Sequence, residues 1–137
     1  MRIFLDTNVL LDFVQDGRPN NNAAKHLFQI LRSSGQEPFI TTQSILDMYF
    51  IASKTDRVKA LRFIDYLLSI FNVRPIESYC LRSALESGNH DFEDSAQLAC
   101  AEDEECDVFL TSDEGILRRD ITSMLVMTPG QFLDRLR

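Results

Sequence analysis

The feature that most constrains the fold is the alternation of short apolar runs with longer segments of helical period. Runs rich in β-branched and aromatic residues occur at 3–5, 39–41, 73–76, 108–110 and 125–127. Helical patterns occupy 9–13, 23–33, 44–52, 58–71, 79–86 and 92–104, and a last helix begins near Pro129. Strands that alternate with helices favour a parallel sheet covered on both faces. The sequence therefore predicts an α/β fold that binds its ligand at the carboxyl ends of the strands.

The length of the chain favours a single domain over residues 1–137. Its 137 residues, 45% hydrophobic and 26% charged, suit one soluble globular core, and we find no repeat or linker that would divide them. Three cysteines without a C-x-x-C pair argue against a disulfide framework, and two histidines are too few for a zinc cage. Asp6 interrupts the apolar N-terminus, so we expect no signal peptide and no membrane span. A reducing, cytoplasmic location fits best.

The charge balance limits how such a protein can handle nucleic acid. Lys and Arg total 14 against 21 for Asp and Glu, which gives a formal net charge of −7. Domains that coat DNA or RNA are usually basic, so we expect weak nucleic-acid binding through local arginines, with cations offsetting an acidic centre. The acidic run at 102–105 is expected to be a solvated surface.

Several aspartates stand at positions where the predicted sheet would present them to a ligand. Asp6 directly follows the first strand, and Asp113 follows strand 108–110 after two residues. Asp91 and Asp94 stand at the start of the predicted helix 92–104. Each of them has a structural explanation when taken alone, because aspartate is a favoured N-cap and first-turn residue.

Asp47 differs because it lies inside the predicted helix 44–52, among apolar residues. Aspartate is a poor helix former, and burying its charge without a partner is costly. A narrow solvent-facing stripe with Gln43 and Lys54 is the alternative. The cost of burial favours a functional role for Asp47.

The joint pattern of acids indicates a metal site. Two unit charges about 4 Å apart repel by about 4 kcal/mol at an effective dielectric constant near 20. Several carboxylates in one pocket therefore need a cation or shifted pKa values. Ligands that are all oxygen favour Mg²⁺ or Mn²⁺, which can orient and activate water for phosphodiester hydrolysis. This chemistry requires no histidine base.

The motifs around these acids resemble those of the PIN-domain nucleases, and within them the VapC-like toxins of bacterial and archaeal toxin–antitoxin pairs. Segment 3–12, Ile-Phe-Leu-Asp-Thr-Asn-Val-Leu-Leu-Asp, is similar to the first acidic motif of the family. The resemblance implies that Asp6 is a metal ligand and that Asn8 supports it by hydrogen bonding. Asp47 takes a position that more often holds glutamate, and a shorter side chain there would reach a metal through water.

The later motifs complete the resemblance across essentially the whole chain. Asp94, in the segment 91–96, falls where the family places its third acid, with Asp91 as its neighbour and support. Segment 109–113 resembles the last motif, in which the hydroxyl residues Thr111 and Ser112 precede the acid Asp113. The resemblance implies catalytic roles for Asp6, Asp47, Asp94 and Asp113, and direct metal ligation by Asp6, Asp94 and Asp113.

The family resemblance also implies an architecture and an activity. The architecture is a three-layer α/β/α sandwich with a five-stranded parallel sheet in the order 3-2-1-4-5. The activity is a Mg²⁺- or Mn²⁺-dependent endoribonuclease, in which a metal-activated water attacks phosphorus in line and leaves 5′-phosphate and 3′-hydroxyl ends. The implied partners are the RNA substrate, an antitoxin that lays a helix into an apolar groove, and a second copy of the chain.

Two other interpretations compete with the nuclease. A phosphotransfer enzyme of the haloacid-dehalogenase or response-regulator kind also places an aspartate after its first strand. The phosphatase motif needs a second aspartate where this chain has Asn8, and both chemistries usually use a late lysine, whereas the last lysine is Lys59. The stronger rival is a catalytically weak or inactive PIN-like module that binds partners. Arg118 and Arg119 either contact RNA phosphates at the rim of the site or form a favourable charge pair at a helix C-terminus.

Overall fold

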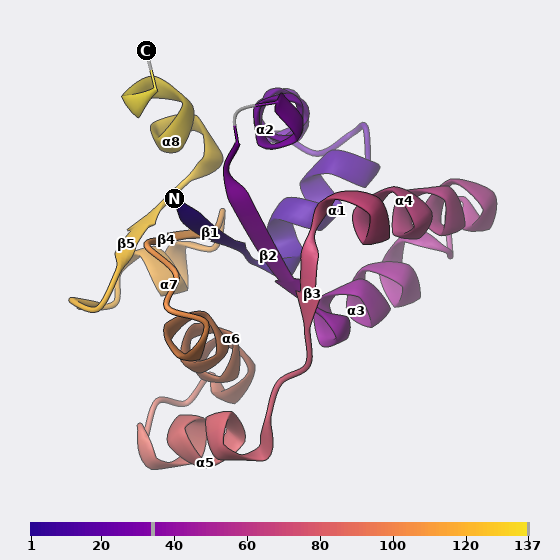
Figure 1. Cartoon of the computed structure of the whole chain (residues 1–137). Helices are drawn as coiled ribbons and strands as arrows, with labels where there is room; N and C mark the ends of the chain where they lie inside the picture. Colours follow the sequence, from indigo (N-terminus) through magenta and orange to yellow (C-terminus); the bar gives the residue numbers. More distant parts are fainter. Residues whose placement is uncertain (34, 137) are drawn as a thin grey trace.

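The sheet has the predicted architecture. The computed structural model describes residues 1–33 and 35–136. Within them, five strands form one sheet in the order β3-β2-β1-β4-β5 (Figure 1), and each neighbouring pair is parallel. The strands are β1 (Arg2–Leu5), β2 (Glu37–Thr41), β3 (Asn72–Arg74), β4 (Val108–Leu110) and β5 (Leu125–Met127). The strand order expected from the family resemblance is confirmed.

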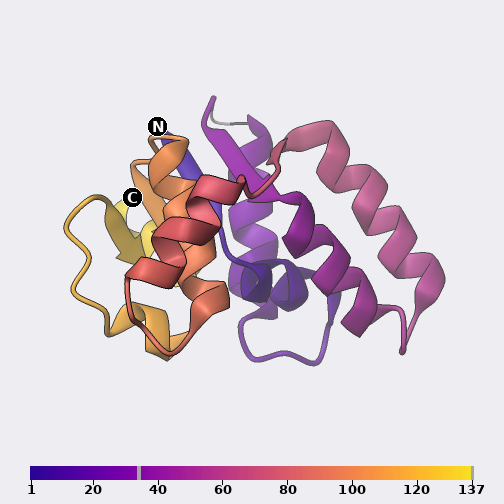
Figure 2. The same cartoon turned by 90° about the horizontal axis from the view of Figure 1, so that it is seen from below.

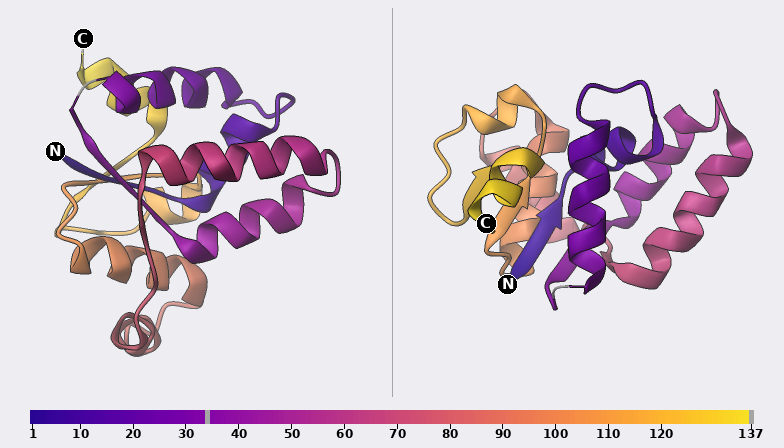
Figure 3. Two further views of the ribbon diagram at one scale, coloured as in Figure 1. Left: turned by 45° about the vertical axis from the view of Figure 1, so that its right-hand side comes forward. Right: turned by 90° about the horizontal axis from the view of Figure 1, so that it is seen from above.

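Helices cover both faces of this sheet (Figures 1 and 2). They are α1 (Thr7–Val14), α2 (Asn21–Ser33), α3 (Thr42–Ala52), α4 (Arg57–Ile70), α5 (Ser78–Glu86), α6 (Phe92–Asp103), α7 (Glu114–Leu117) and α8 (Pro129–Arg135). Helices α1 to α4 and α8 pack on one face, α6 and α7 pack on the other, and α5 packs against α6. Helices α3 and α4 lie side by side (Figure 3).

The core follows the two-residue period of the strands. In β1, Ile3 and Leu5 face the α1–α4 side, whereas Phe4 faces α6 and α7. The ring of Phe4 stacks on that of Phe109 in β4 with centroids 5.2 Å apart. These side chains are fully buried, so the two strands that end at the site, β1 and β4, are covered on both faces.

Most of the predicted elements are present, with small shifts at their ends. Strand β3 is earlier and shorter than the predicted 73–76, and α2 begins at Asn21, two residues before the predicted 23–33. Helix α7, which follows Asp113, is too short to show a helical period, so only the N-cap explanation of Asp113 and the C-terminal explanation of Arg118 and Arg119 indicated it. In the described parts of the chain, no helix has the length and apolar character needed to cross a bilayer.

Candidate metal centre and active site

A cavity of about 780 Å³ lies where β1 and β4 end. Its polar lining comes from α1, α3, α6 and the start of α7: Asp6, Thr7, Asn8, Thr42, Gln43, Asp47, Asp91, Glu93, Asp94, Gln97 and Asp113. Its apolar lining includes Leu11, Phe50, Ile51, Pro75, Ile76, Leu81, Phe92 and Ala96. The tertiary structure therefore brings acids from positions 6 to 113 of the chain to one cavity.

Asp6 is the most buried of these acids, with an exposed fraction of 4%. It is the N-cap of α1, and its Oδ1 accepts a hydrogen bond from the Thr7 amide at 2.8 Å. Its Oδ2 accepts from the Thr111 hydroxyl, also at 2.8 Å. Burial raises the pKa of Asp6 to about 6; the two hydrogen bonds oppose the shift, and the charges on Asp113 and Asp91 add to it.

Asp113 is tied to Asp6 through Thr111. The Asp113 amide donates to Thr111 Oγ1 at 2.9 Å, and that hydroxyl in turn donates to Asp6. Asp113 also caps α7, because its Oδ1 accepts from the amides of Gly115 and Ile116 at 2.7 and 3.3 Å. A Cβ on residue 115 would lie 2.9 Å from Asp113 Oδ1, so a side chain at this position would displace the capping carboxylate.

The two acids of α6 share their environment. Asp91 is the N-cap, and its Oδ1 accepts from the Asp94 amide at 3.0 Å. Burial raises the pKa of Asp94 to about 7, reinforced by the hydrogen bond and charge of Asp91 and then by the charges of Asp6 and Asp113. The pKa of Asp91 is lowered, chiefly because it accepts from the Asp94 amide. Asp6, Asp91 and Asp113 are therefore N-caps, which is the structural explanation that the sequence gives for each of them alone. All three also line the same cavity.

The chemistry of the donors fits a hard divalent cation. Carboxylates that raise one another's pKa are stabilised by a positive charge placed between them, and oxygen donors suit Mg²⁺ or Mn²⁺. Within residues 1–33 and 35–136, no group of three Asp, Glu, His or Cys side chains is already arranged to hold an ion. The ligand set Asp6, Asp94 and Asp113 therefore stays a prediction.

Comparison with known proteins places this chain in a family. A model of the PIN domain matches residues 2–115. The chain belongs to the PIN domain family. Ribonuclease VapC1 of Aquifex aeolicus is 27% identical over 139 aligned residues, which cover 98% of this chain and 94% of the relative. The predicted resemblance to VapC-like toxins is thereby confirmed.

Solved structures share the fold of this PIN domain. VapC20 of Mycobacterium tuberculosis, described as a toxin that cleaves the sarcin-ricin loop, superposes with a TM-score of 0.72 at 13% identity, over 89% of this chain and 98% of that one. A toxin–antitoxin complex from Klebsiella pneumoniae gives a TM-score of 0.68 at 22% identity, over 93% and 97% of the two chains.

Two predicted residues of the PIN domain have environments that differ from expectation. Asp47 is half-buried rather than buried, and its Oδ1 accepts from Gln43 Nε2 at 2.9 Å, so the argument from the cost of burial was wrong. It nevertheless lines the cavity. Asn8 lines the cavity too, but the hydrogen bonds found on Asp6 come from Thr7 and Thr111.

Ser112 bonds to a further acid, Asp12, next to the site. Its hydroxyl donates to Asp12 Oδ2 at 3.0 Å, and the Oδ1 of that buried carboxylate accepts from Arg18 Nε at 2.9 Å. This pair ties the loop after β4 to α1 and to the loop that follows it. Asp12 was not predicted as a site residue, although an acid on an otherwise apolar helix is the signal that could have revealed it.

A buried polar network was also missed. Gln97 Nε2 donates to the hydroxyls of Thr41 and Ser44 at 3.2 and 3.1 Å, and Ser44 Oγ lies 2.7 Å from the Thr7 hydroxyl. Gln97 Oε1 has no hydrogen-bond partner among the residues that the structure describes. Because Gln97 lies one turn after Asp94, this network holds α6 against α1 and α3 beside the cavity.

The two predicted RNA-contacting arginines differ from each other. Arg118 is exposed, and its Nη2 lies 3.0 Å from an exposed carboxylate oxygen of Glu114. Arg119 is half-buried, and its guanidinium donates to polar groups within residues 89–95. Contact with RNA phosphates stays a prediction for Arg118, whereas Arg119 already has partners inside the protein.

Proposed function

We propose that this PIN domain is a Mg²⁺- or Mn²⁺-dependent endoribonuclease and the toxin of a toxin–antitoxin pair. The observation that carries the proposal is the convergence of Asp6, Asp94 and Asp113 on one cavity, with the pKa of Asp6 and of Asp94 raised. Family membership supports the same activity. Carboxylates that repel one another in the free protein are suited to binding a divalent cation.

In this proposal the chain's own residues orient the cation ligands. Asp6 is held by the Thr7 amide and the Thr111 hydroxyl, and Asp113 is held by the amides at the start of α7. Asp94 completes the set from α6. A bound Mg²⁺ or Mn²⁺ would polarise the scissile phosphodiester and offset the charge that develops on its oxygens.

The shape and lining of the cavity suit single-stranded RNA. A cavity of about 780 Å³ is in the size range of small-molecule sites, so it can accept a nucleotide segment. Phe50 and Phe92 line it with exposed rings on which bases can stack. The net charge of −7 opposes RNA binding, so substrate capture should depend on the bound cation.

The apolar rim of the cavity supports an antitoxin as partner. The rim has four apolar side chains that are between 41% and 65% exposed and that line the same cavity as the carboxylates: Phe50, Ile51, Leu81 and Phe92. An amphipathic helix that carries a basic side chain would cover the apolar rim and place a positive charge near the carboxylates. The Klebsiella pneumoniae structure of the same fold is a toxin–antitoxin complex. We propose that the antitoxin blocks RNA cleavage in this way.

The test is cleavage of single-stranded RNA by the purified protein. We expect cleavage with Mn²⁺ or Mg²⁺, none with EDTA, and loss of cleavage in Asp6→Asn, in which the amide is a poor metal ligand. Cleavage by Asp6→Asn at the wild-type level would indicate a contaminating nuclease and contradict the proposal. Co-expression with the product of an adjacent antitoxin-like reading frame should suppress the cleavage.

The second candidate is a PIN-like module that binds partners without cutting RNA. It is favoured by Asp47, which stands where the family more often has glutamate, and by the lack of a ready-made metal-holding group in the described residues. Such a module would capture its partner protein while showing no metal-dependent turnover of RNA. The same cleavage assay, run beside a pull-down of the partner, separates the two functions.

A further inference from the structure

Arg119 connects two elements that both carry acids of the cavity. It follows α7, which begins after Asp113, and its guanidinium reaches the loop before α6 and the first turn of that helix. Its hydrogen bonds, 2.9, 2.9 and 3.2 Å long, run from Nη1 to Ser95 Oγ and from Nη2 to Asn89 Oδ1 and to the Asp91 carbonyl oxygen. These partners lie 24 to 30 residues away in sequence.

The contacts converge on the residue that caps α6. The Asp91 carbonyl oxygen accepts from the Ser95 amide at 3.2 Å, from the Ser95 hydroxyl at 3.0 Å and from Arg119. The Asn89 side chain accepts from Arg119 and also from the Asp91 amide at 2.9 Å. Both backbone groups of Asp91 are therefore fixed by this cluster, and the cap that Asp91 forms sets the position of Asp94.

The partners of Arg119 are neutral. They are a hydroxyl, a side-chain amide and a backbone carbonyl, so the guanidinium is held close to the acids without an ion pair to their carboxylates in the described residues. A guanidinium paired with the carboxylates would compete with a cation for them. Arg119 instead leaves the carboxylate oxygens available while linking α7 to α6.

The fork of the guanidinium explains why arginine is needed. Its two terminal nitrogens bond to different acceptors, whereas a lysine ammonium presents its three N–H donors from one nitrogen at the end of a flexible chain. Arg118, the neighbouring residue of the same type, is exposed and pairs with Glu114 on its own helix. The two arginines therefore form a natural pair of test and control positions.

We propose that Arg119 is a positioning residue that holds the start of α6 at a fixed distance from α7, so that Asp94 and Asp113 bind one divalent cation together. This inference rests on the proposed metal-dependent function. It assigns Arg119 to the assembly of the ligand set rather than to contact with RNA.

The experiment compares Arg119→Ala, Arg119→Lys and Arg118→Ala with the wild type. Mn²⁺ affinity is measured by titration calorimetry on the metal-free protein, and amide hydrogen exchange of residues 89–95 is measured in EDTA. We expect Arg119→Ala to lose about 10- to 100-fold in Mn²⁺ affinity, a typical cost of removing support behind a metal ligand, and to exchange faster at 89–95. Arg119→Lys should be intermediate, and Arg118→Ala should match the wild type in both measurements.

The kinetics add a signature that a general loss of stability would not produce. Arg119→Ala should need more Mn²⁺ for half-maximal cleavage, while its KM for RNA at saturating Mn²⁺ stays at the wild-type value. If a folded Arg119→Ala protein binds Mn²⁺ with the wild-type affinity, the proposal is overturned. This holds both when the melting temperature of the variant falls and when only its RNA binding weakens. A wild-type protein that binds no Mn²⁺ overturns the proposed function as well, so the two failures are distinguishable.

Discussion

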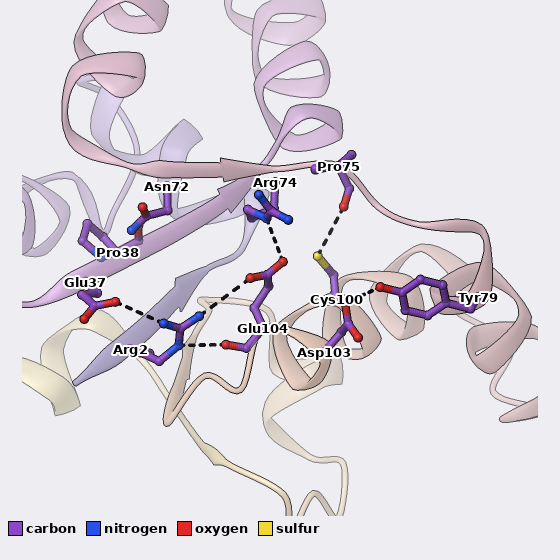
Figure 4. A network of polar contacts seen from close by, with 10 residues as sticks. All are labelled: Arg2, Glu37, Pro38, Asn72, Arg74, Pro75, Tyr79, Cys100, Asp103 and Glu104. Carbon is purple, nitrogen blue, oxygen red and sulfur yellow. Dashed lines mark hydrogen bonds and ion pairs between the residues drawn. The ribbon is translucent and has the colours of Figure 1, made fainter.

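The two ends of helix α6 hold carboxylates in opposite surroundings. At its start, Asp91 and Asp94 face other acids, and the pKa of Asp94 is raised to about 7 by burial and by its acidic neighbours. At its end, Glu104 lies 2.8 Å from Arg74 Nε and 3.7 Å from Arg2 Nη2 (Figure 4). Carboxylates paired with arginines are already satisfied within the fold, whereas carboxylates that face one another gain most from a cation supplied from outside.

The network at the end of α6 is structural. Arg2 Nε also donates to the Glu104 carbonyl oxygen at 2.8 Å, and Arg2 Nη1 pairs with Glu37 of β2 at 3.1 Å (Figure 4). These contacts join β1, β2 and β3 to the C-terminal end of α6. The expectation that run 102–105 is a solvated surface holds for Glu102, Asp103 and Glu105, which are exposed. Glu104 is the exception, because its side chain is only 17% exposed.

The largest expected effect is on RNA cleavage, which should depend on the acids at the start of α6 and of α7 and not on Glu104 at the end of α6. Asp113→Asn should lower RNA cleavage on the order of 10²- to 10³-fold, because a charge that stabilises the transition state through the cation is lost. Asparagine keeps the cap of α7, so the fold should persist. Glu104→Gln, at the other end, should cleave RNA at the wild-type rate. Single-turnover kinetics at saturating Mn²⁺ measure both, and a similar loss in both variants would break the comparison.

The next effect is on the free energy of unfolding. In the metal-free protein the pKa of Asp6, about 6, lies above its ordinary 3.8, so the folded state binds more protons than the unfolded state between these values. Its contribution to stability is present at low pH and is lost as pH rises through about 6. Asp6→Asn should therefore be more stable than the wild type by about 2 kcal/mol near pH 7.5 in EDTA.

Urea denaturation across this pH range provides the measurement. Mn²⁺ at about 100 times its Kd should stabilise the wild type by about 2.7 kcal/mol and leave Asp6→Asn unchanged. The Glu104→Gln protein is the matched control, because its site is intact and it should respond to Mn²⁺ like the wild type. If Asp6→Asn is less stable than the wild type at neutral pH, the charge of Asp6 does not destabilise the folded protein.

The smallest effect concerns the paired carboxylate. Glu104→Gln removes one charge from a half-buried network, so the melting temperature should fall by about 2–5 °C, and by less at high salt. Glu114→Gln, which loses an exposed pair with Arg118, should melt within error of the wild type. Scanning calorimetry at low and high salt distinguishes the two variants. Equal shifts in melting temperature would mean that the burial of Glu104 contributes nothing to stability.

Much of the fold could be predicted because its signals are local. The period of apolar residues located the strands and the longer helices, and aspartates after strands predicted where helices begin. Helix α7 has too few residues to show a period, so only the N-cap explanation of Asp113 indicated where it begins. For Asp47, the sequence predicted its helix, but not that the side chain is half-buried and bonded to Gln43.

The sequence by itself determined the alternation of strands and helices. It also determined that Asp6, Asp91, Asp94 and Asp113 stand near the end of a strand or at the start of a helix. The tertiary structure decided the partners: Thr111 for Asp6, 105 residues away, Asn89 for Arg119, and Arg2 for Glu104. The physical reason is how far along the chain each interaction reaches. Helical period and capping depend on the free energies of a few adjacent residues. The partner of a polar side chain depends instead on which groups are buried together when the helices pack on the sheet.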